Sequence, residues 1–137
     1  MKLLVSADIH GVVDVYEWLI RTAAERLPDA VVLAGDLLGG YGEEATIEET
    51  HAREARALAG RLAAMPCPVL YVMGNDDQAE FPPEAPRLIP LHARRVEFPP
   101  YNFVGYRYSL PFIGRETEKP EVEIEAESLE SEVLGPT

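Results

Sequence analysis

Apolar residues in the first part of the chain alternate between short unbroken runs and longer stretches with helical spacing. The unbroken runs lie at residues 2–7, 30–34 and 69–73. They predict three strands, and the first is expected to be buried on both faces. Helical spacing begins near Val15 and again over residues 43–65, which predicts two helices between the strands. This order of elements indicates a parallel α/β sheet with right-handed crossovers.

The rest of the chain has a different composition. Prolines at positions 82, 83, 86 and 90 predict an extended loop. Residues 94–98 and 102–108 are rich in strand-forming types and predict a hairpin across Pro99 and Pro100. The end segment predicts an amphipathic helix, with apolar residues at heptad-like spacing: Val122, Ala126, Leu129 and Val133. The alternative for this segment is a disordered acidic tail.

Length and composition favour a single domain over residues 1–137. The hydrophobic content of 47% is sufficient for a buried core. Within this domain we expect a βαβαβ core at residues 1–80, a β-rich segment at 81–115 and an acidic helix at 116–137.

The formal net charge of −12 is concentrated at the end of the chain, where residues 116–137 hold eight glutamates and one lysine. No basic cluster offers a footprint for sequence-specific nucleic acid or for an anionic membrane surface. No apolar run approaches the length of a membrane span. Cys67 is the single cysteine, so an internal disulfide is excluded and a reducing, cytoplasmic location is expected.

Polar residues with ligand atoms follow each of the three predicted strands. Asp8 and His10 follow the first, Asp36 the second and Asn75 the third. Ligands gather at the carboxyl ends of parallel strands, so these side chains converge if the strands are neighbours. Carboxylate, imidazole and amide groups suit Mn²⁺, Fe, Zn²⁺ or Ni²⁺ better than Ca²⁺. A central carboxylate such as Asp36 can bridge two metal ions about 3.5–4 Å apart.

The three blocks together resemble the first signature blocks of the calcineurin-like metallophosphoesterases, in particular a compact prokaryotic phosphodiesterase branch. The blocks are Asp8-Ile9-His10, Gly35-Asp36 and Gly74-Asn75-Asp76-Asp77. The resemblance implies an α-β-β-α sandwich and two divalent metal ions, with Mn²⁺ as the first choice. It implies that Asp8 and His10 bind the first ion, Asp36 bridges and Asn75 binds the second. The implied activity is that of a hydrolase of phosphate esters, in which a metal-bridging hydroxide attacks the phosphorus.

The third block departs from the common family pattern. Much of the family has a histidine after the asparagine, thought to protonate the leaving group, and this chain has Asp76. The phosphodiesterase branch also lacks that histidine, which favours a phosphodiesterase. Asp76 is a candidate catalytic residue, although we expect it to orient groups at the edge of the site, because nearby metal ions oppose its protonation. Asp77 matches an acidic position that supplies a supporting hydrogen bond.

A second departure concerns the later part of the family pattern. The family has further histidines after a later strand and in a Gly-His-x-His block, whereas His92 is the only histidine beyond Asp77. The resemblance therefore covers the N-terminal portion of the family domain, truncated after the first βαβαβ unit, a hairpin and a helix. It predicts weak or single-metal binding. The alternatives are a catalytically inactive relative that acts as a binding or regulatory module and a shortened fragment. A homo-oligomer could cover the truncated edge.

Other candidate residues have simpler interpretations. We expect His51 and His92 to be structural and Cys67 to be a buried apolar residue. Tyr101, Tyr106 and Tyr108 are expected to pack on the hairpin, and the glycines at 39, 40 and 42 to form a site rim. Arg115 could approach a substrate phosphate.

Overall fold

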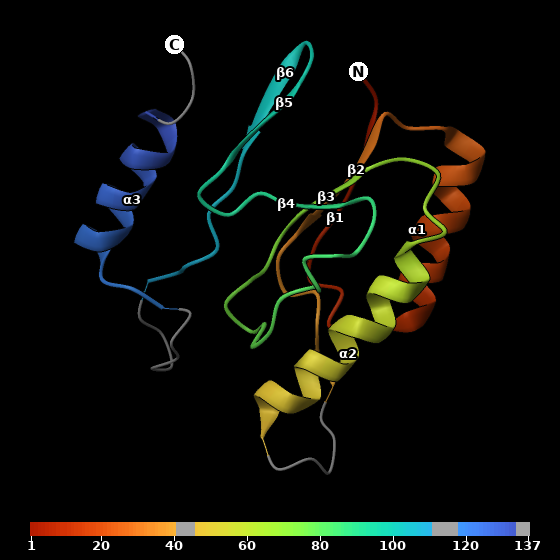
Figure 1. Cartoon of the computed structure of the whole chain (residues 1–137), viewed down its shortest axis with the longest axis horizontal. Helices are drawn as coiled ribbons and strands as arrows, with labels where there is room; N and C mark the ends of the chain where they lie inside the picture. Colours follow the sequence, from red (N-terminus) through yellow and green to blue (C-terminus); the bar gives the residue numbers. More distant parts are fainter. Residues whose placement is uncertain (41–45, 111–117, 134–137) are drawn as a thin grey trace.

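The computed structural model describes residues 1–40, 46–110 and 118–133. Its main sheet has four parallel strands in the order β1-β2-β3-β4 (Figure 1). These strands are β1 (Leu3–Ser6), β2 (Ala30–Ala34), β3 (Val69–Val72) and β4 (Leu88–Pro90). The three predicted strands are thus direct neighbours, with Val5 paired to Val32 and Val32 to Leu70. This adjacency is what allows the loops after them to meet.

Two helices cover one face of this sheet (Figure 1). They are α1 (Val13–Arg26) and α2 (Ile47–Leu62). The α1 helix ends before Pro28, as predicted, with Leu27 in a left-handed conformation that donates its N–H to the carbonyl of Ala23 at 2.9 Å. Thr46 caps α2 by accepting from the N–H of Glu49 at 3.1 Å. Residues 43–45, where the second helix was predicted to begin, lie outside the described ranges.

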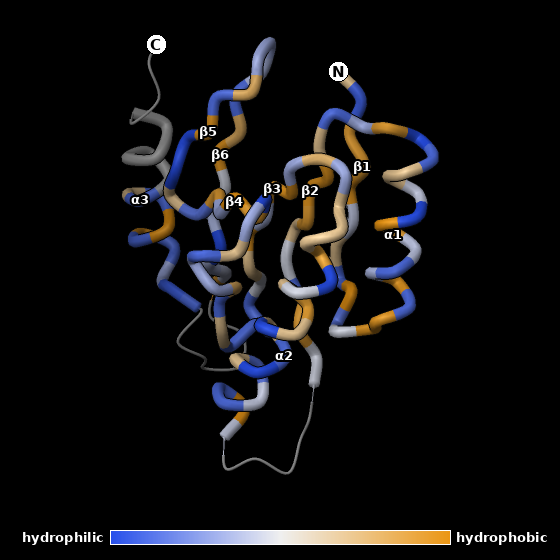
Figure 2. Tube along the Cα trace, turned by 45° about the vertical axis from the view of Figure 1, so that its right-hand side comes forward, coloured by the Kyte–Doolittle hydropathy of each residue, from blue (hydrophilic) through white to orange (hydrophobic). Residues whose placement is uncertain are grey.

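Alternate residues of the strands belong to two apolar clusters, one on each side of the sheet. Figure 2 shows that the strands of this sheet are mainly hydrophobic. On the helix side, Val31 and Leu33 of β2 pack with α1 and α2 residues such as Leu19 and Leu58. On the other side, a smaller cluster lies under the hairpin: Ala30, Leu70, Leu91, Val32, Ile89, Val96, Phe98 and Phe103.

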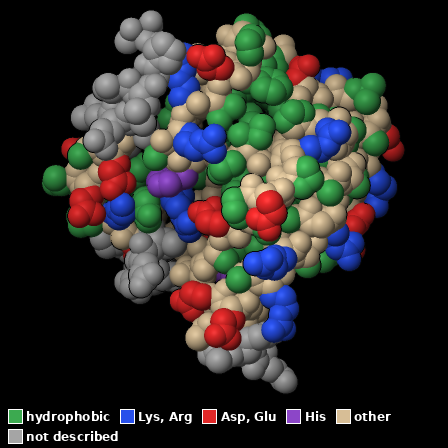
Figure 3. Space-filling view, viewed as in Figure 1, with side chains coloured by type: hydrophobic (Ala, Val, Ile, Leu, Met, Phe, Trp, Pro, Cys, Tyr) green, Lys and Arg blue, Asp and Glu red, His purple; other side chains and the backbone are tan. Residues whose placement is uncertain are grey.

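The prediction that the first strand is buried on both faces is wrong. Leu3 and Val5 of β1 are exposed by 37% and 60%, while Leu4 packs against the helix-side core. The apolar cluster that includes the hairpin residues also contains residues of β2, β3 and β4, and no described residue of β1. Hydrophobic side chains therefore gather on the surface of the molecule (Figure 3), and the exposed ones include Leu3, Val5 and Val104.

The prediction of an unbroken extended loop around residues 81–90 is also wrong, because it contains β4. Ile89 pairs with Leu70, and the N–H of Leu91 donates to the carbonyl of Tyr71 at 2.8 Å. Pro90 is tolerated because β4 is an edge strand, where a missing N–H costs no ladder hydrogen bond. The prolines in this segment disfavour a strand in a prediction from sequence, and only the pairing with β3 identifies β4.

The predicted hairpin is confirmed as β5 (Arg95–Phe98) and β6 (Tyr101–Val104), joined at the cis Pro99–Pro100 bond. None of the helices in the described ranges has the length and apolar character of a membrane-spanning segment.

The acidic end segment forms a helix, α3 (Glu121–Val133), and two residues of the predicted apolar stripe, Val122 and Ala126, are exposed. Val122 is exposed by 76%, whereas Ile124 and Glu127 are half-buried. Glu127 accepts hydrogen bonds from Tyr106 and from Lys119, the latter at 2.6 Å. These polar contacts set the rotation of the helix. The side chains of Leu129 and Val133 are outside the described part.

Candidate metal centre

The loops after β1 and β2 run side by side at the carboxyl edge of the sheet. The N–H of Asp8 donates to the carbonyl of Gly35 at 3.0 Å, and the N–H of His10 donates to the carbonyl of Asp36 at 2.9 Å. Gly11 continues this ladder to the carbonyl of Leu37 at 2.9 Å. The backbone therefore carries the parallel pairing beyond the strands and places the first two polar blocks next to each other.

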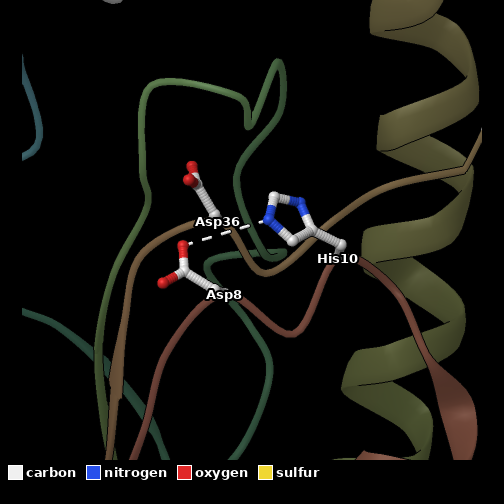
Figure 4. Close-up of side chains that lie close together, drawn as sticks. All are labelled: Asp8, His10 and Asp36. Atoms are coloured by element: carbon white, nitrogen blue, oxygen red, sulfur yellow. Dashed lines mark ion pairs between the residues drawn. The ribbon is translucent and has the colours of Figure 1, made fainter.

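Asp8, His10 and Asp36 bring their side chains to one place (Figure 4). One ligand atom from each lies within 4.8 Å of the others, and Nε2 of His10 is 3.9 Å from Oδ1 of Asp8. Asp8 and His10 are exposed and Asp36 is half-buried. This is the convergence that the strand-end pattern predicts.

The same three residues have left-handed backbone conformations. The φ angles are 53° for Asp8, 49° for His10 and 53° for Asp36. Aspartate and histidine are among the non-glycine residues that adopt this region most readily. Such conformations persist where the surroundings hold them in place, and they cluster at functional sites.

The charge at this edge favours a bound cation. Burial raises the pKa of the Asp36 carboxyl, and the carboxylates of Asp76 and Asp77 raise it further, while the N–H of Asp76 and nearby His10 lower it. Oxygen and nitrogen donors in this combination fit a divalent transition metal. The residues present therefore fit the metal that the resemblance implies.

The third predicted block lies against the same site. Asn75 lines a hollow of about 220 Å³ together with Asp8 and Asp36. The backbone N–H of Asp76 donates to Oδ1 of Asp36 at 3.1 Å. Asp76 thus contacts the candidate bridging carboxylate through its backbone N–H. A catalytic role for the Asp76 side chain remains a prediction.

Asp77 ties the second and third loops together from inside the protein. Its side chain is fully buried, and Oδ2 accepts from the N–H groups of Leu37 at 3.1 Å and Gly74 at 2.7 Å. Oδ1 accepts from the N–H of Leu38 at 2.8 Å. One carboxylate therefore joins the loop carrying Asp36 to the loop carrying Asn75.

Two residues at the site were not found from the sequence. Glu54 of α2 accepts from the N–H of Gly39 at 2.8 Å, which anchors the loop after Asp36 to the helix. Arg107 lines the hollow beside Asp36 and Asn75. Neither residue lies at a strand end or in a recognisable motif, so no signal in the sequence singled them out.

The remaining predictions concern residues away from the metal ligands. His51 is buried, and its Nδ1 accepts from the N–H of Gln78 at 3.0 Å. Nδ1 of His92 accepts from the N–H of Arg107 at 3.2 Å, and its ring packs against Tyr106 and Tyr108. The structural roles predicted for both histidines are confirmed. Cys67 lies in the apolar core as predicted, and Arg115 and Gly42 lie outside the described residues.

Glycine is required at position 39 by a close backbone approach. A Cβ atom there would lie 2.2 Å from the carbonyl oxygen of His10. We expect Gly39→Ala to lower the free energy of unfolding by about 2 kcal/mol or more, because backbone atoms must move. Urea unfolding followed by circular dichroism measures this change.

Gly60 of α2 supplies the matched control, since a Cβ there meets no atom within 4 Å. Gly60→Ala should raise stability by about 0.5–1 kcal/mol, because alanine favours the helix. Equal effects of the two substitutions would show that the contact between Gly39 and His10 does not constrain the loop.

The fold and the strand-end cluster together define an α/β domain with a candidate metal site formed by loops after adjacent parallel strands. The family model for calcineurin-like phosphoesterases matches residues 1–129. The chain therefore belongs to this family of metallophosphoesterases, and the resemblance drawn from the three sequence blocks is confirmed. No curated protein matches it in sequence.

Two solved structures share the fold. One crystal structure superposes with a TM-score of 0.76 at 14% sequence identity, covering 98% of this chain and 65% of its own. The crystal structure of TT1561 from Thermus thermophilus has a TM-score of 0.70 at 18% identity, covering 93% and 60% respectively. This chain thus spans slightly less than two thirds of each. The predicted fold class, a metallophosphoesterase-like fold present in part, is confirmed.

Proposed function

We propose that this chain carries the N-terminal part of a metal-dependent phosphodiesterase site. The observation that carries the proposal is the convergence of ligand atoms from Asp8, His10 and Asp36 within 4.8 Å. Asn75 lines the same hollow from the next loop, as a second ligand group would. Family membership supports hydrolysis of phosphate esters as the reaction class.

In this proposal Asp8, His10 and Asp36 hold one divalent ion, and Asp36 with Asn75 supplies part of a second site. When bound, the ions supply positive charge that holds a phosphate oxygen and lowers the pKa of a coordinated water. The buried Asp77 carboxylate keeps the second and third loops at a constant separation. Mn²⁺ is the proposed ion because mixed carboxylate and imidazole ligands suit it.

The preference for diesters rests on the third block. An aspartate, Asp76, follows Asn75 where much of the family has an imidazole. Among the described residues that line the hollow there is no histidine. The proposal therefore assigns no imidazole to protonation of the leaving group.

A second candidate function is that of a binding or regulatory module without turnover. The observation that favours it is the small ligand set for a second ion, which in the described residues amounts to Asp36 and Asn75. The coverage of 65% and 60% of the two related structures is consistent with an incomplete site. In this case a second copy of the chain could cover the exposed residues of β1. A cytoplasmic location remains our expectation for either function.

Calorimetric titration with Mn²⁺, together with an assay on bis(p-nitrophenyl) phosphate, tests the proposal. We expect about one Mn²⁺ to bind per chain, because Asp8, His10 and Asp36 supply three ligand groups to one ion, whereas the described residues offer only Asp36 and Asn75 to a second. Mn²⁺-dependent hydrolysis of the diester should exceed that of p-nitrophenyl phosphate. Mn²⁺ binding without turnover would favour the module, and an absence of Mn²⁺ binding would refute the phosphodiesterase proposal.

A further inference from the structure

The hollow at the candidate metal centre has a second group of lining residues. Besides the strand-end residues, Tyr106, Arg107 and Ser109 line it, and they come from the segment that follows β6. Arg107 is the one cationic side chain among the described residues that line this hollow. From this placement we infer that Arg107 binds the phosphate group of the substrate, an inference that rests on the proposed function.

Arg107 is held in place before any ligand arrives. Its Nη2 donates to the backbone carbonyl of Asp77 at 3.0 Å, and its Nη1 pairs with Oε1 of Glu80 at 2.5 Å. Its side chain is exposed by only 13%. A buried and anchored guanidinium loses little freedom on binding an anion, which favours affinity.

The guanidinium retains donors for a ligand. Each terminal nitrogen of arginine carries two N–H groups. Within the described part of the chain, each terminal nitrogen of Arg107 makes one hydrogen bond. One N–H on each terminal nitrogen is thus left to donate to the oxygens of a phosphate.

The charge around the hollow requires such a group. Asp8 and Asp36 line it, and Asp76 follows directly after Asn75. A phosphate approaching these carboxylates is repelled unless cations offset them. Bound metal ions offset the charge at the strand ends, and Arg107 offsets it from the segment after β6.

Arg107 also lines a second hollow of about 310 Å³, to which Gln78 and Tyr108 contribute. The two hollows share this one side chain. Glu48, Asp77 and Glu80 also line the second hollow, so the Arg107 guanidinium is the cationic group among the described lining residues of both.

A purely structural role for Arg107 makes a different prediction. In that role Arg107 is a brace between Glu80 and the backbone of Asp77, and breaking the ion pair from either end has the same effect. In the binding role, the loss of Arg107 weakens phosphate affinity far more than the loss of Glu80, because the carbonyl of Asp77 still anchors Nη2 when Glu80 is absent. Glu80→Gln removes the ion-pair partner and leaves the Arg107 cation in place. Comparison with a substitution of Arg107 therefore distinguishes the binding role from the structural role.

The test uses inorganic phosphate as the probe and the Mn²⁺-loaded full chain. Mn²⁺ affinity is measured first by calorimetry, and phosphate affinity then by broadening of the ³¹P resonance. We expect Arg107→Gln to weaken phosphate binding about tenfold or more, with Mn²⁺ affinity within twofold of the wild type. Arg107→Lys should give an intermediate loss, because lysine keeps the charge and loses the paired donors. Glu80→Gln should lose no more than about twofold in phosphate affinity, because the Arg107 cation and its anchor at the Asp77 carbonyl remain.

Two results overturn the inference. One is unchanged phosphate affinity in Arg107→Gln or, if that variant does not fold, in Arg107→Lys. The other is an equal loss of phosphate affinity in Arg107→Gln and Glu80→Gln, which would show that Arg107 has only the structural role. If the wild-type chain binds no Mn²⁺, the proposed function itself fails. A wild-type chain that binds Mn²⁺ and phosphate, with no effect of Arg107, would overturn only the inference drawn here.

Discussion

Asp36→Asn is expected to reduce Mn²⁺ affinity and Mn²⁺-dependent diester hydrolysis at least about 100-fold. Removal of a group outside the ligand set already costs 10–100-fold in metal affinity, so loss of a ligand carboxylate costs more. Asp36 is central because its side chain joins Asp8 and His10 in one cluster and accepts from the N–H of Asp76. Calorimetry with Mn²⁺ and the bis(p-nitrophenyl) phosphate assay measure the two effects.

Asp29→Asn is the matched control, because the same chemical change occurs at the other end of β2. Asp29 accepts from the N–H of Lys2 at 2.7 Å and lies before the strand, whereas Asp36 lies after it. We expect this variant to retain wild-type Mn²⁺ affinity. If Asp36→Asn kept both affinity and rate while its circular dichroism was unchanged, the proposed metal centre would be wrong.

Asp77→Ala is expected to destabilise the protein by about 3 kcal/mol or more. The substitution leaves the N–H groups of Leu37, Leu38 and Gly74 without their acceptor, and each buried unpaired donor costs about 1–3 kcal/mol. Asp77→Asn keeps the shape and one acceptor oxygen, so we expect a smaller loss of about 1–3 kcal/mol. Urea unfolding gives the free energies. Mn²⁺ affinity should fall in both variants, since the loops that carry Asp36 and Asn75 lose their link.

Glu25→Gln provides the control for this series, because Glu25 is an exposed carboxylate in α1. Its removal should change stability by no more than about 0.5 kcal/mol. A wild-type unfolding midpoint for Asp77→Ala would mean that other groups or water satisfy the three donors.

The candidate site was predictable to the extent that it depends on strand ends. Asp8, His10, Asp36 and Asn75 each follow a short apolar run, and parallel strands deliver their carboxyl ends to one edge. The sequence could not determine that β1, β2 and β3 are neighbours, which is what brings these residues together. It indicated a supporting hydrogen bond from Asp77 but contained no sign of the contacts of Glu54 and Arg107, because these join residues distant in the chain.

The helices and strands also differ in how far the sequence predicted them. Periodicity predicted α1 and α2, because an amphipathic helix repeats its apolar positions within a few residues. It missed β4, since the prolines near residues 82–90 disfavour a strand except at a sheet edge. It also placed Val122 and Ala126 on the inward face of α3, where both are exposed, and it did not indicate that Glu127 accepts from Tyr106 and Lys119.

The sequence by itself determined the family, the parallel α/β order and the candidate ligands. These are local properties, written as periodicity and as polar residues directly after apolar runs. Only the tertiary structure decided which groups the predicted supporting residue Asp77 binds, and that Glu54 of α2 and Arg107 of the segment after β6 lie at the site. It also decided that Leu3 and Val5 are exposed. The physical reason is that hydrogen-bond partners and burial depend on packing between distant segments, which no local pattern specifies.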